Sequence, residues 1–292
     1  METFVRSDLA IESGALDEGS GVRVTEGEGG GCRILRVQIK TPEAAARIGK
    51  PEGQYVTVDC GALCALDERE LERVSRAVGV ELRSMAERVC GKRITSEFSV
   101  LVVGLGNRSV TPDSVGPETV CRLSVTRHLK SMESAVLAAG GLCRISAVEP
   151  GVPAVTGLET AETVEGIVRV TAPDLVLAVD ALTARSADRL GNTVQLSSGG
   201  IRPASGVERG HCALDRESLG VPVLSLGVPT AVGSDTLAYD LLQRAGISDL
   251  RDLRALLERG RGFLVTTSGI DLLVRCAGIL LADAIERAFS VL

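Results

Sequence analysis

Short apolar runs that alternate with helix-forming segments are the feature that most limits how this chain can fold. The runs expected to be strands are Ser99–Val103, Gly141–Val148, Leu175–Val179 and Val221–Leu226. Helical periodicity follows them, at 114–128, 159–170, 184–190, 234–245, 250–258 and 269–289. Buried strands joined by helical crossovers are typical of a parallel sheet with helices on both faces. The sequence therefore predicts an α/β fold with a mostly parallel sheet flanked by helices.

The first part of the chain has a different pattern. Val22–Thr25 and Cys32–Ile39 alternate apolar and polar residues on either side of a glycine-rich stretch, which predicts a β-hairpin. Asp67–Val89 repeats apolar residues at three- and four-residue spacing, as a long amphipathic helix does. No Pro/Ser-rich linker divides the 292 residues, so we expect one elaborated domain with an added N-terminal hairpin region.

Charge and composition argue against several classes of partner. The net charge is −6 and only 2% of the residues are aromatic. Nucleic-acid binding needs a basic surface, and single strands also need aromatic stacking, so no direct nucleic-acid contact is expected. The N-terminus has no apolar signal core, and the apolar stretch near 270–281 is broken by Asp271 and Arg275. Eight cysteines without C-x-x-C spacing suggest free thiols, and we expect a cytoplasmic protein.

The sequence lacks the motifs of several common enzyme classes. The chain has two histidines, His128 and His211, and neither belongs to an H-E-x-x-H motif. A G-x-S-x-G nucleophile elbow is also absent. The Gly104-Leu-Gly106 turn resembles a dinucleotide loop, but Ser109 stands where the third glycine should be. Carboxylates remain as the candidate reactive groups.

Two aspartates follow predicted strands and could form an acid/base pair. Asp180 directly follows the apolar run 175–179, and Asp113 comes just before a predicted helix. Each could instead be a helix cap, Asp113 for the helix beginning near 114 and Asp180 for the one near 184. If the two carboxyls meet, they cannot both ionise easily and their pKa values separate. The pattern alone leaves both interpretations open.

Both aspartates lie inside longer motifs, at 104–117 (GLGNRSVTPDSVGP) and 179–186 (VDALTARS). Further motifs lie at 126–129, 149–152, 156–160, 198–206 (SGGIRPASG) and 220–223. Together these motifs resemble those of the spore germination proteases. The resemblance runs from about Phe4 to Phe289 and keeps the same order along the chain.

This resemblance implies a function. Members of that family are endopeptidases that begin the degradation of small acid-soluble spore proteins at germination, which implies those substrates here. The family's two essential aspartates correspond to Asp113 and Asp180. The resemblance also implies a homotetrameric zymogen located in the forespore or spore core, and an aspartic type of catalysis.

The family's fold is similar to that of the hydrogenase maturation endopeptidases, which bind a metal with acids and a histidine at the corresponding strand ends. No histidine stands at a matching third position in this sequence. We therefore expect no metal and no cofactor, and prefer an acid pair that activates water.

The N-terminal segment 5–12 (VRSDLAIE) is similar to the family's processing sequence. We expect self-cleavage between Asp8 and Leu9, which makes residues 1–8 a propeptide and residues 9–292 the peptidase domain. Substrates would likewise be cut after an acidic residue and before an apolar one.

Weaker site candidates come from the remaining motifs. Thr160 and Arg185 could orient the acids or the scissile carbonyl. A backbone-rich substrate loop is expected at 197–206, and its contact residues are Ser198, Gly199, Gly200, Ser205 and Gly206. Ala204 stands where the family pattern leads us to expect glycine, and the segment 232–262 looks shorter than in many members.

Two rival interpretations stay open. The first is a metallopeptidase of the hydrogenase-maturation type that uses Asp113 and Asp180 as metal ligands. The second is a binding or assembly protein that has the fold without catalysis.

Overall fold

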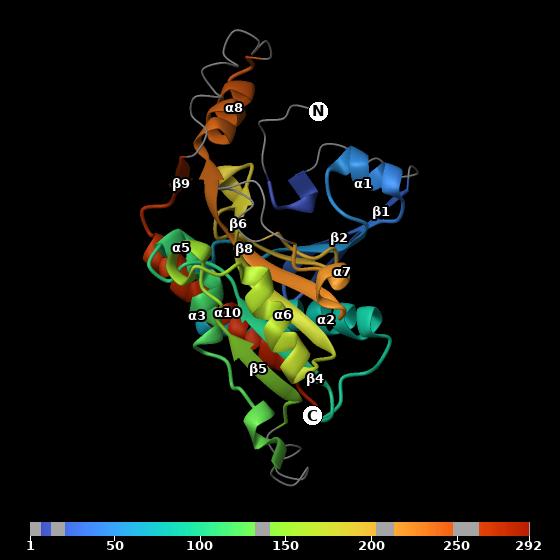
Figure 1. Ribbon diagram of the computed structural model, residues 1–292. Helices are drawn as coiled ribbons and strands as arrows, with labels where there is room; N and C mark the ends of the chain where they lie inside the picture. The colour runs from blue at the N-terminus through green and yellow to red at the C-terminus, as the bar shows by residue number, and fades with distance from the viewer. Residues whose placement is uncertain (1–6, 13–20, 132–140, 203–212, 248–262, 292) are drawn as a thin grey trace.

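The computed structural model describes residues 7–12, 21–131, 141–202, 213–247 and 263–291. Within these ranges the strands form one nine-stranded sheet in the order β1-β2-β3-β7-β8-β6-β4-β5, and β9 pairs with β8 (Figure 1). The strands are β1 (Val22–Gly29), β2 (Cys32–Ile39), β3 (Gly53–Asp59), β4 (Ser99–Gly104), β5 (Arg144–Val148), β6 (Leu175–Ala184), β7 (Thr193–Ser197), β8 (Val223–Gly233) and β9 (Leu264–Thr266). The fold is α/β, as predicted.

The prediction of a mostly parallel sheet was wrong, because the sheet is mixed. Among the described strands, the pairs β4–β5, β4–β6 and β6–β8 are parallel and the other pairs are antiparallel. The N-terminal hairpin β1–β2 is present as predicted, and it continues into β3 and then β7 through antiparallel pairs. β7 closes the sheet against β8, again antiparallel. Short connections suffice for antiparallel neighbours, whereas parallel ones need helical crossovers, so the alternating pattern described only the second half of the sheet.

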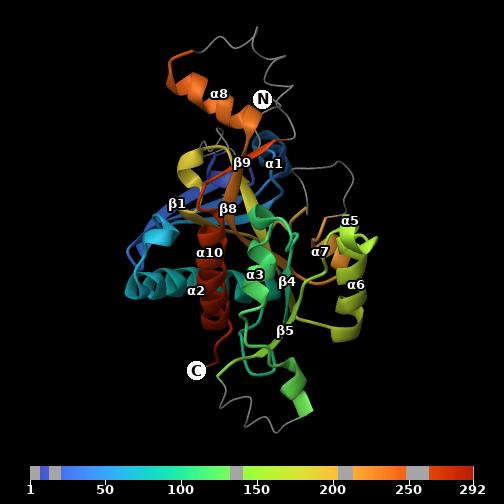
Figure 2. The same ribbon diagram turned by 90° about the vertical axis from the view of Figure 1, so that its left-hand side faces the viewer.

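Helices cover both faces of the sheet (Figure 2). On one face lie α2 (Glu68–Cys90), α3 (Val115–Val120) and α10 (Ile270–Ala288), and on the other lie α6 (Thr160–Thr171) and α7 (Arg216–Leu219). The larger core cluster is on the α2/α10 face, where the Phe289 ring stacks on Phe98 with centroids 6.1 Å apart. Other helices within the described ranges are α1 (Pro42–Ile48), α5 (Pro153–Thr156) and α8 (Ser234–Arg244).

Local signals account for several of these helices. Asp67 and Glu70 form a reciprocal capping box at the start of α2, and Thr41 caps α1 ahead of Pro42. The helix expected over 114–128 was wrong in length, because α3 ends at Val120. The helix expected over 250–258 lies outside the described residues.

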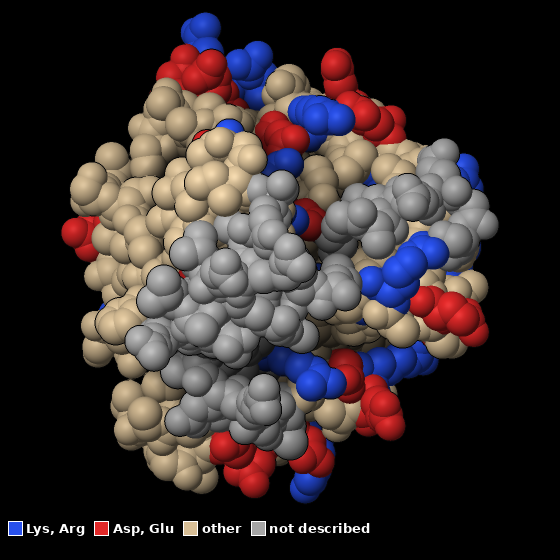
Figure 3. Space-filling model, turned by 90° about the horizontal axis from the view of Figure 1, so that it is seen from above, with Lys and Arg blue, Asp and Glu red and all other residues tan. Residues whose placement is uncertain are grey.

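The surface seen from above carries both acidic and basic side chains, which are interspersed around its edge (Figure 3). Among the residues that the structure describes, none of the helices combines the length and apolar character that a membrane span requires.

Candidate active site

A cleft of about 1120 Å³ opens where β6, β7 and β8 meet the loop after β4. Asp113, Asp180 and Asp8 all contribute to its wall. In open α/β sheets the carboxyl ends of parallel strands are the usual place for ligands, and β4, β6 and β8 end toward this region. The structure thus brings both predicted aspartates and the predicted processing site to one cleft.

Asp180 lies inside β6 and not at its end. The strand continues to Ala184 and pairs with β8 throughout, so the expectation that the strand stops at residue 179 was wrong. The side chain is 9% exposed, and its Oδ1 accepts a hydrogen bond from the Ala181 amide at 2.8 Å. Burial raises the pKa of Asp180 well above its usual value, and repulsion from Asp113 and then Asp8 raises it further. The carboxyl does not cap the 3-10 helix Ala187–Arg189, whose cap is Ser186.

Asp113 ends the 3-10 helix η3 (Thr111–Asp113), which leads into α3. Its Oδ2 accepts from the Asn107 amide at 2.8 Å, so it is bound to the loop after β4 and does not cap α3. Burial raises the pKa of Asp113, and the Asn107 hydrogen bond partly offsets that rise. The Thr230 hydroxyl of β8 donates to the Pro112 carbonyl at 2.7 Å and ties η3 to the sheet.

Two glycines allow η3 and α3 to approach the strands closely. A Cβ at Gly106, whose φ is +112°, would lie 1.8 Å from the Asp113 carbonyl oxygen. A Cβ at Gly116 would lie 2.5 Å from the Val179 carbonyl oxygen. Larger residues at either place would push Asp113 away from Asp180.

The N-terminal segment lies across the cleft beside β6. The Asp8 amide donates to the Thr183 carbonyl, and the Thr183 amide donates to Asp8 Oδ2, both at 2.8 Å. Leu9 is fully buried against Leu182, Ala184 and Val232. The predicted processing site is therefore held by its backbone, its acidic side chain and its apolar side chain.

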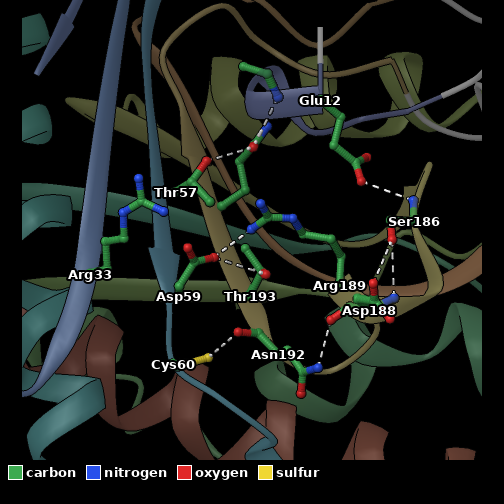
Figure 4. A network of polar contacts seen from close by, with 12 residues as sticks. Glu12, Arg33, Thr57, Asp59, Cys60, Ser186, Asp188, Arg189, Asn192 and Thr193 are labelled. Carbon is green, nitrogen blue, oxygen red and sulfur yellow. Dashed lines mark hydrogen bonds and ion pairs between the residues drawn. The ribbon is translucent and has the colours of Figure 1, made fainter. Parts of the chain in front are cut away.

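Further contacts hold the N-terminal segment on either side of the Asp8–Leu9 bond. Before it, Lys50 Nζ donates to the Ser7 carbonyl at 2.8 Å. After it, the Glu12 carboxylate accepts from the Arg185 amide at 2.7 Å. It also accepts from the Ser186 amide at 3.0 Å (Figure 4).

Gln195 of β7 is a residue that the sequence analysis missed. Its side-chain amide contacts the backbone at Asp8 and Ala10. Neither β7 nor any motif at this position was predicted, because a lone glutamine carries no chemical signature and its strand becomes recognisable only beside β3 and β8.

Some of the residues predicted to bind or orient the substrate line this cleft, and others do not. Thr160, Gly199 and Gly200 line the cleft, and the Thr160 hydroxyl donates to the Gly151 carbonyl at 3.4 Å. Ser198 exchanges hydrogen bonds with the Gln54 backbone. The Arg185 guanidinium lies over the Tyr239 ring and lines a neighbouring pocket. Ser205 and Gly206 lie outside the described residues.

The described ranges contain no group of three or more His, Cys, Asp and Glu side chains that could hold a metal ion. His128 lies in the 3-10 helix Arg127–Ser131, and His211 lies outside the described residues. The donor set of a metal site is thus not found in this part of the chain.

Comparison with known proteins identifies the family to which the chain belongs. The sequence model of the germination protease family matches residues 5–245, a range that includes the N-terminal segment and both aspartates. The germination protease of Caldanaerobacter subterraneus subsp. tengcongensis is 41% identical, over 82% of this chain and 72% of that protein. Those of Clostridium acetobutylicum and Bacillus subtilis are each 37% identical, over 82% and 89% of this chain and 73% of each relative. At such identity over most of its length, this chain belongs to the germination proteases, a family of peptidases.

Proposed function

We propose that this protein is a self-processing endopeptidase in which Asp113 and Asp180 activate water for hydrolysis. The observation that carries the proposal is the place of Asp8, which lines the same cleft as Asp113 and Asp180. The segment is bound there by hydrogen bonds from β6 and by a buried apolar side chain, as a substrate would be.

The different environments of the two acids assign their roles. Asp180 is the more deeply buried and faces two other carboxyls, so it keeps a proton and acts as the acid. Each acid accepts one backbone amide hydrogen bond, but Asp113 is less buried, and the pKa of Asp180 is raised more, so Asp113 acts as the base.

In each reaction cycle Asp113 takes up one proton and Asp180 gives one up. Water forms a bond to the Asp8 carbonyl carbon while one of its protons passes to Asp113. The carbonyl oxygen carries the negative charge until the carbon–nitrogen bond breaks. Asp180 gives its proton to the departing Leu9 nitrogen, and exchange with solvent restores both acids.

Contacts on either side of the bond explain a preference for an acid followed by an apolar residue. The Asp8 carboxylate, just before the bond, accepts from the Thr183 amide. The Lys50 ammonium donates to the Ser7 carbonyl and adds a positive charge that interacts with Asp8. The side chain after the bond enters the apolar pocket formed by Leu182, Ala184 and Val232. Substrates with the same order of residues would fill both places.

Several wider properties are part of the proposal. The substrates are small acid-soluble spore proteins, and the enzyme acts in the forespore or spore core as a homotetramer. Residues 1–8 are the propeptide and residues 9–292 form one peptidase domain, for which the continuous sheet from β1 to β9 gives support. The arrangement of strand, aspartate and helix is similar to that of the hydrogenase maturation endopeptidases.

The test is digestion of a purified small acid-soluble spore protein. The wild-type enzyme should cut it between an acidic and an apolar residue, with and without a metal chelator. Asp113→Asn and Asp180→Asn should each lower the rate at least roughly 1000-fold. Full activity in either variant would refute the acid pair, and loss of wild-type activity with the chelator would favour a metallopeptidase.

A further inference from the structure

A side-chain amide holds the backbone on both sides of the proposed scissile bond. Gln195 Nε2 donates to the Asp8 carbonyl oxygen at 2.8 Å, and Gln195 Oε1 accepts from the Ala10 amide at 3.2 Å. A carbonyl only accepts and a backbone N–H only donates, so the two contacts fix the orientation of the glutamine amide. Both contacts of Gln195 with the N-terminal segment are therefore to peptide groups and not to side chains.

Gln195 belongs to a row of residues that crosses the sheet in register. Thr57 of β3 lies opposite Gln195, and Gln195 lies opposite Gly227 of β8. Gly227 in turn lies opposite Asp180 of β6. Partners in register project their side chains to the same face of a sheet, so Gln195 and Asp180 face the cleft together.

The residue between them is a glycine, and no larger residue fits there. A Cβ at Gly227 would lie 2.5 Å from the Asp180 carbonyl oxygen and 2.8 Å from the Leu182 side chain. Gly227 also lines the cleft. Atoms of β6 already occupy the place of that Cβ, so a glycine at this position lets β6 and β8 lie close together beside the cleft.

The glutamine is held in place by the protein itself. Gln195 is 4% exposed, and the Thr57 hydroxyl donates to its Oε1 at 3.3 Å. A buried donor that is already oriented needs little rearrangement when charge develops on a carbonyl oxygen.

We propose that Gln195 is a catalytic residue of this peptidase. Its Nε2 stabilises the oxygen of the scissile carbonyl as negative charge develops, and its Oε1 aligns the chain through the N–H two residues later. The inference rests on the proposed function, since it takes the Asp8–Leu9 bond as the bond that is cut. Because the contacts are to the backbone, the same role applies to substrates of any sequence.

The first test is steady-state cleavage of a synthetic peptide with the sequence of residues 1–16 by the self-processed enzyme. Gln195→Ala removes both contacts, and Gln195→Glu removes the donor to the carbonyl but keeps the acceptor. Each should lower kcat by roughly 100-fold or more, with less than about a threefold change in KM. Thr193→Val is the matched control, because Thr193 lies on the same face of β7 but contacts Asp59. It should keep the wild-type kcat.

A modified peptide separates this role from a folding effect. N-methylation at Ala10 removes the N–H that Gln195 Oε1 accepts. The modification should lower kcat/KM for the wild-type enzyme by roughly tenfold, as expected for one lost hydrogen bond. In Gln195→Ala it should change kcat/KM by less than about twofold, because the partner is already missing.

The outcomes distinguish the two proposals. A wild-type kcat in Gln195→Ala, or an equal effect of N-methylation in both enzymes, would overturn the role of Gln195. The proposed function would still stand after such a result, provided that Asp113→Asn is inactive on the same peptide. If the wild-type enzyme leaves the peptide intact, the proposed function fails and the role of Gln195 fails with it.

Discussion

At the scale of single residues, the site depends on two carboxyls that have different surroundings. The sequence left capping as an alternative for both, and the structure rules it out because each carboxylate is bound elsewhere. Asp113 accepts from Asn107 in the loop after β4, and Asp180 accepts from the next residue of its own strand. Their positions after predicted strands made the two aspartates candidates, and the family motifs favoured the pair over capping. Position alone could not decide, since a carboxyl's partners depend on residues far away along the chain.

The first prediction concerns the pH dependence of kcat/KM. The proposed mechanism needs an ionised Asp113 and a protonated Asp180, so activity should fall as the pH drops through the pKa of Asp113. It should also fall as the pH rises through the pKa of Asp180. Both pKa values are raised, so the bell-shaped profile should centre above the range of ordinary carboxyl groups. A rate that is flat from acidic to alkaline pH would contradict the assigned roles.

The second prediction concerns stability. Asp180 keeps its proton to a higher pH in the folded protein than in the unfolded chain, where its usual value is 3.8. Its contribution to the free energy of unfolding is therefore most favourable at low pH and is lost as the pH rises through the raised pKa. Asp180→Asn should stabilise the fold by roughly 1–3 kcal/mol at neutral pH and by little at acidic pH.

Thermal denaturation between about pH 4 and about pH 8 checks this prediction. Asn107→Ala is a suitable control, since the Asn107 contact to Asp113 uses the backbone amide and survives the change. If Asp180→Asn is less stable than the wild-type protein at every pH, the buried Asp180 carboxylate does not destabilise the folded state, and the prediction is wrong.

At the scale of elements, the periodic and capped segments were predictable and the site strands were not. The long helix α2 follows from its spacing and its capping box, and β4 from its apolar run. By contrast, β6 extends past Asp180 because it pairs with β8 as far as Ala184. β7 forms a strand because it pairs with β3 along its length and with β8 at Gln195–Ser197. Strand pairing is a long-range interaction, so no local pattern could supply it.

The third prediction tests the close approach of α3 to the strands. Gly116→Ala would place a Cβ 2.3 Å from the Leu105 carbonyl oxygen and 2.5 Å from that of Val179. The resulting shift of η3 should cost roughly 1–3 kcal/mol of stability and lower kcat by about 100-fold. Both quantities can be measured on the same preparation, by denaturation and by peptide cleavage.

Gly166→Ala is the matched control, because a Cβ at this position of α6 meets no atom within 4 Å. It should raise stability by roughly 0.5–1 kcal/mol through helix propensity and leave kcat unchanged. Equal kcat values in the two variants would argue that α3 does not position Asp113.

At the scale of the whole molecule, the site lies at the junction of a parallel and an antiparallel half of one sheet. The parallel half brings Asp180, and the loop after β4 brings Asp113. The antiparallel half brings Gln195 on β7. The N-terminal segment contacts both halves of the sheet at this junction, through Thr183 of β6 and Gln195 of β7, as the proposed self-processing requires.

The most direct test of the central claim is mass spectrometry of the N-terminus after incubation under mildly acidic conditions. The account predicts loss of residues 1–8 and a new N-terminus at Leu9 in the wild-type protein. Asp113→Asn and Asp180→Asn should keep residues 1–8 under the same conditions. Cleavage at Leu9 in either variant, or a wild-type chain that stays intact, would contradict the claim that these two aspartates cut the bond beside them.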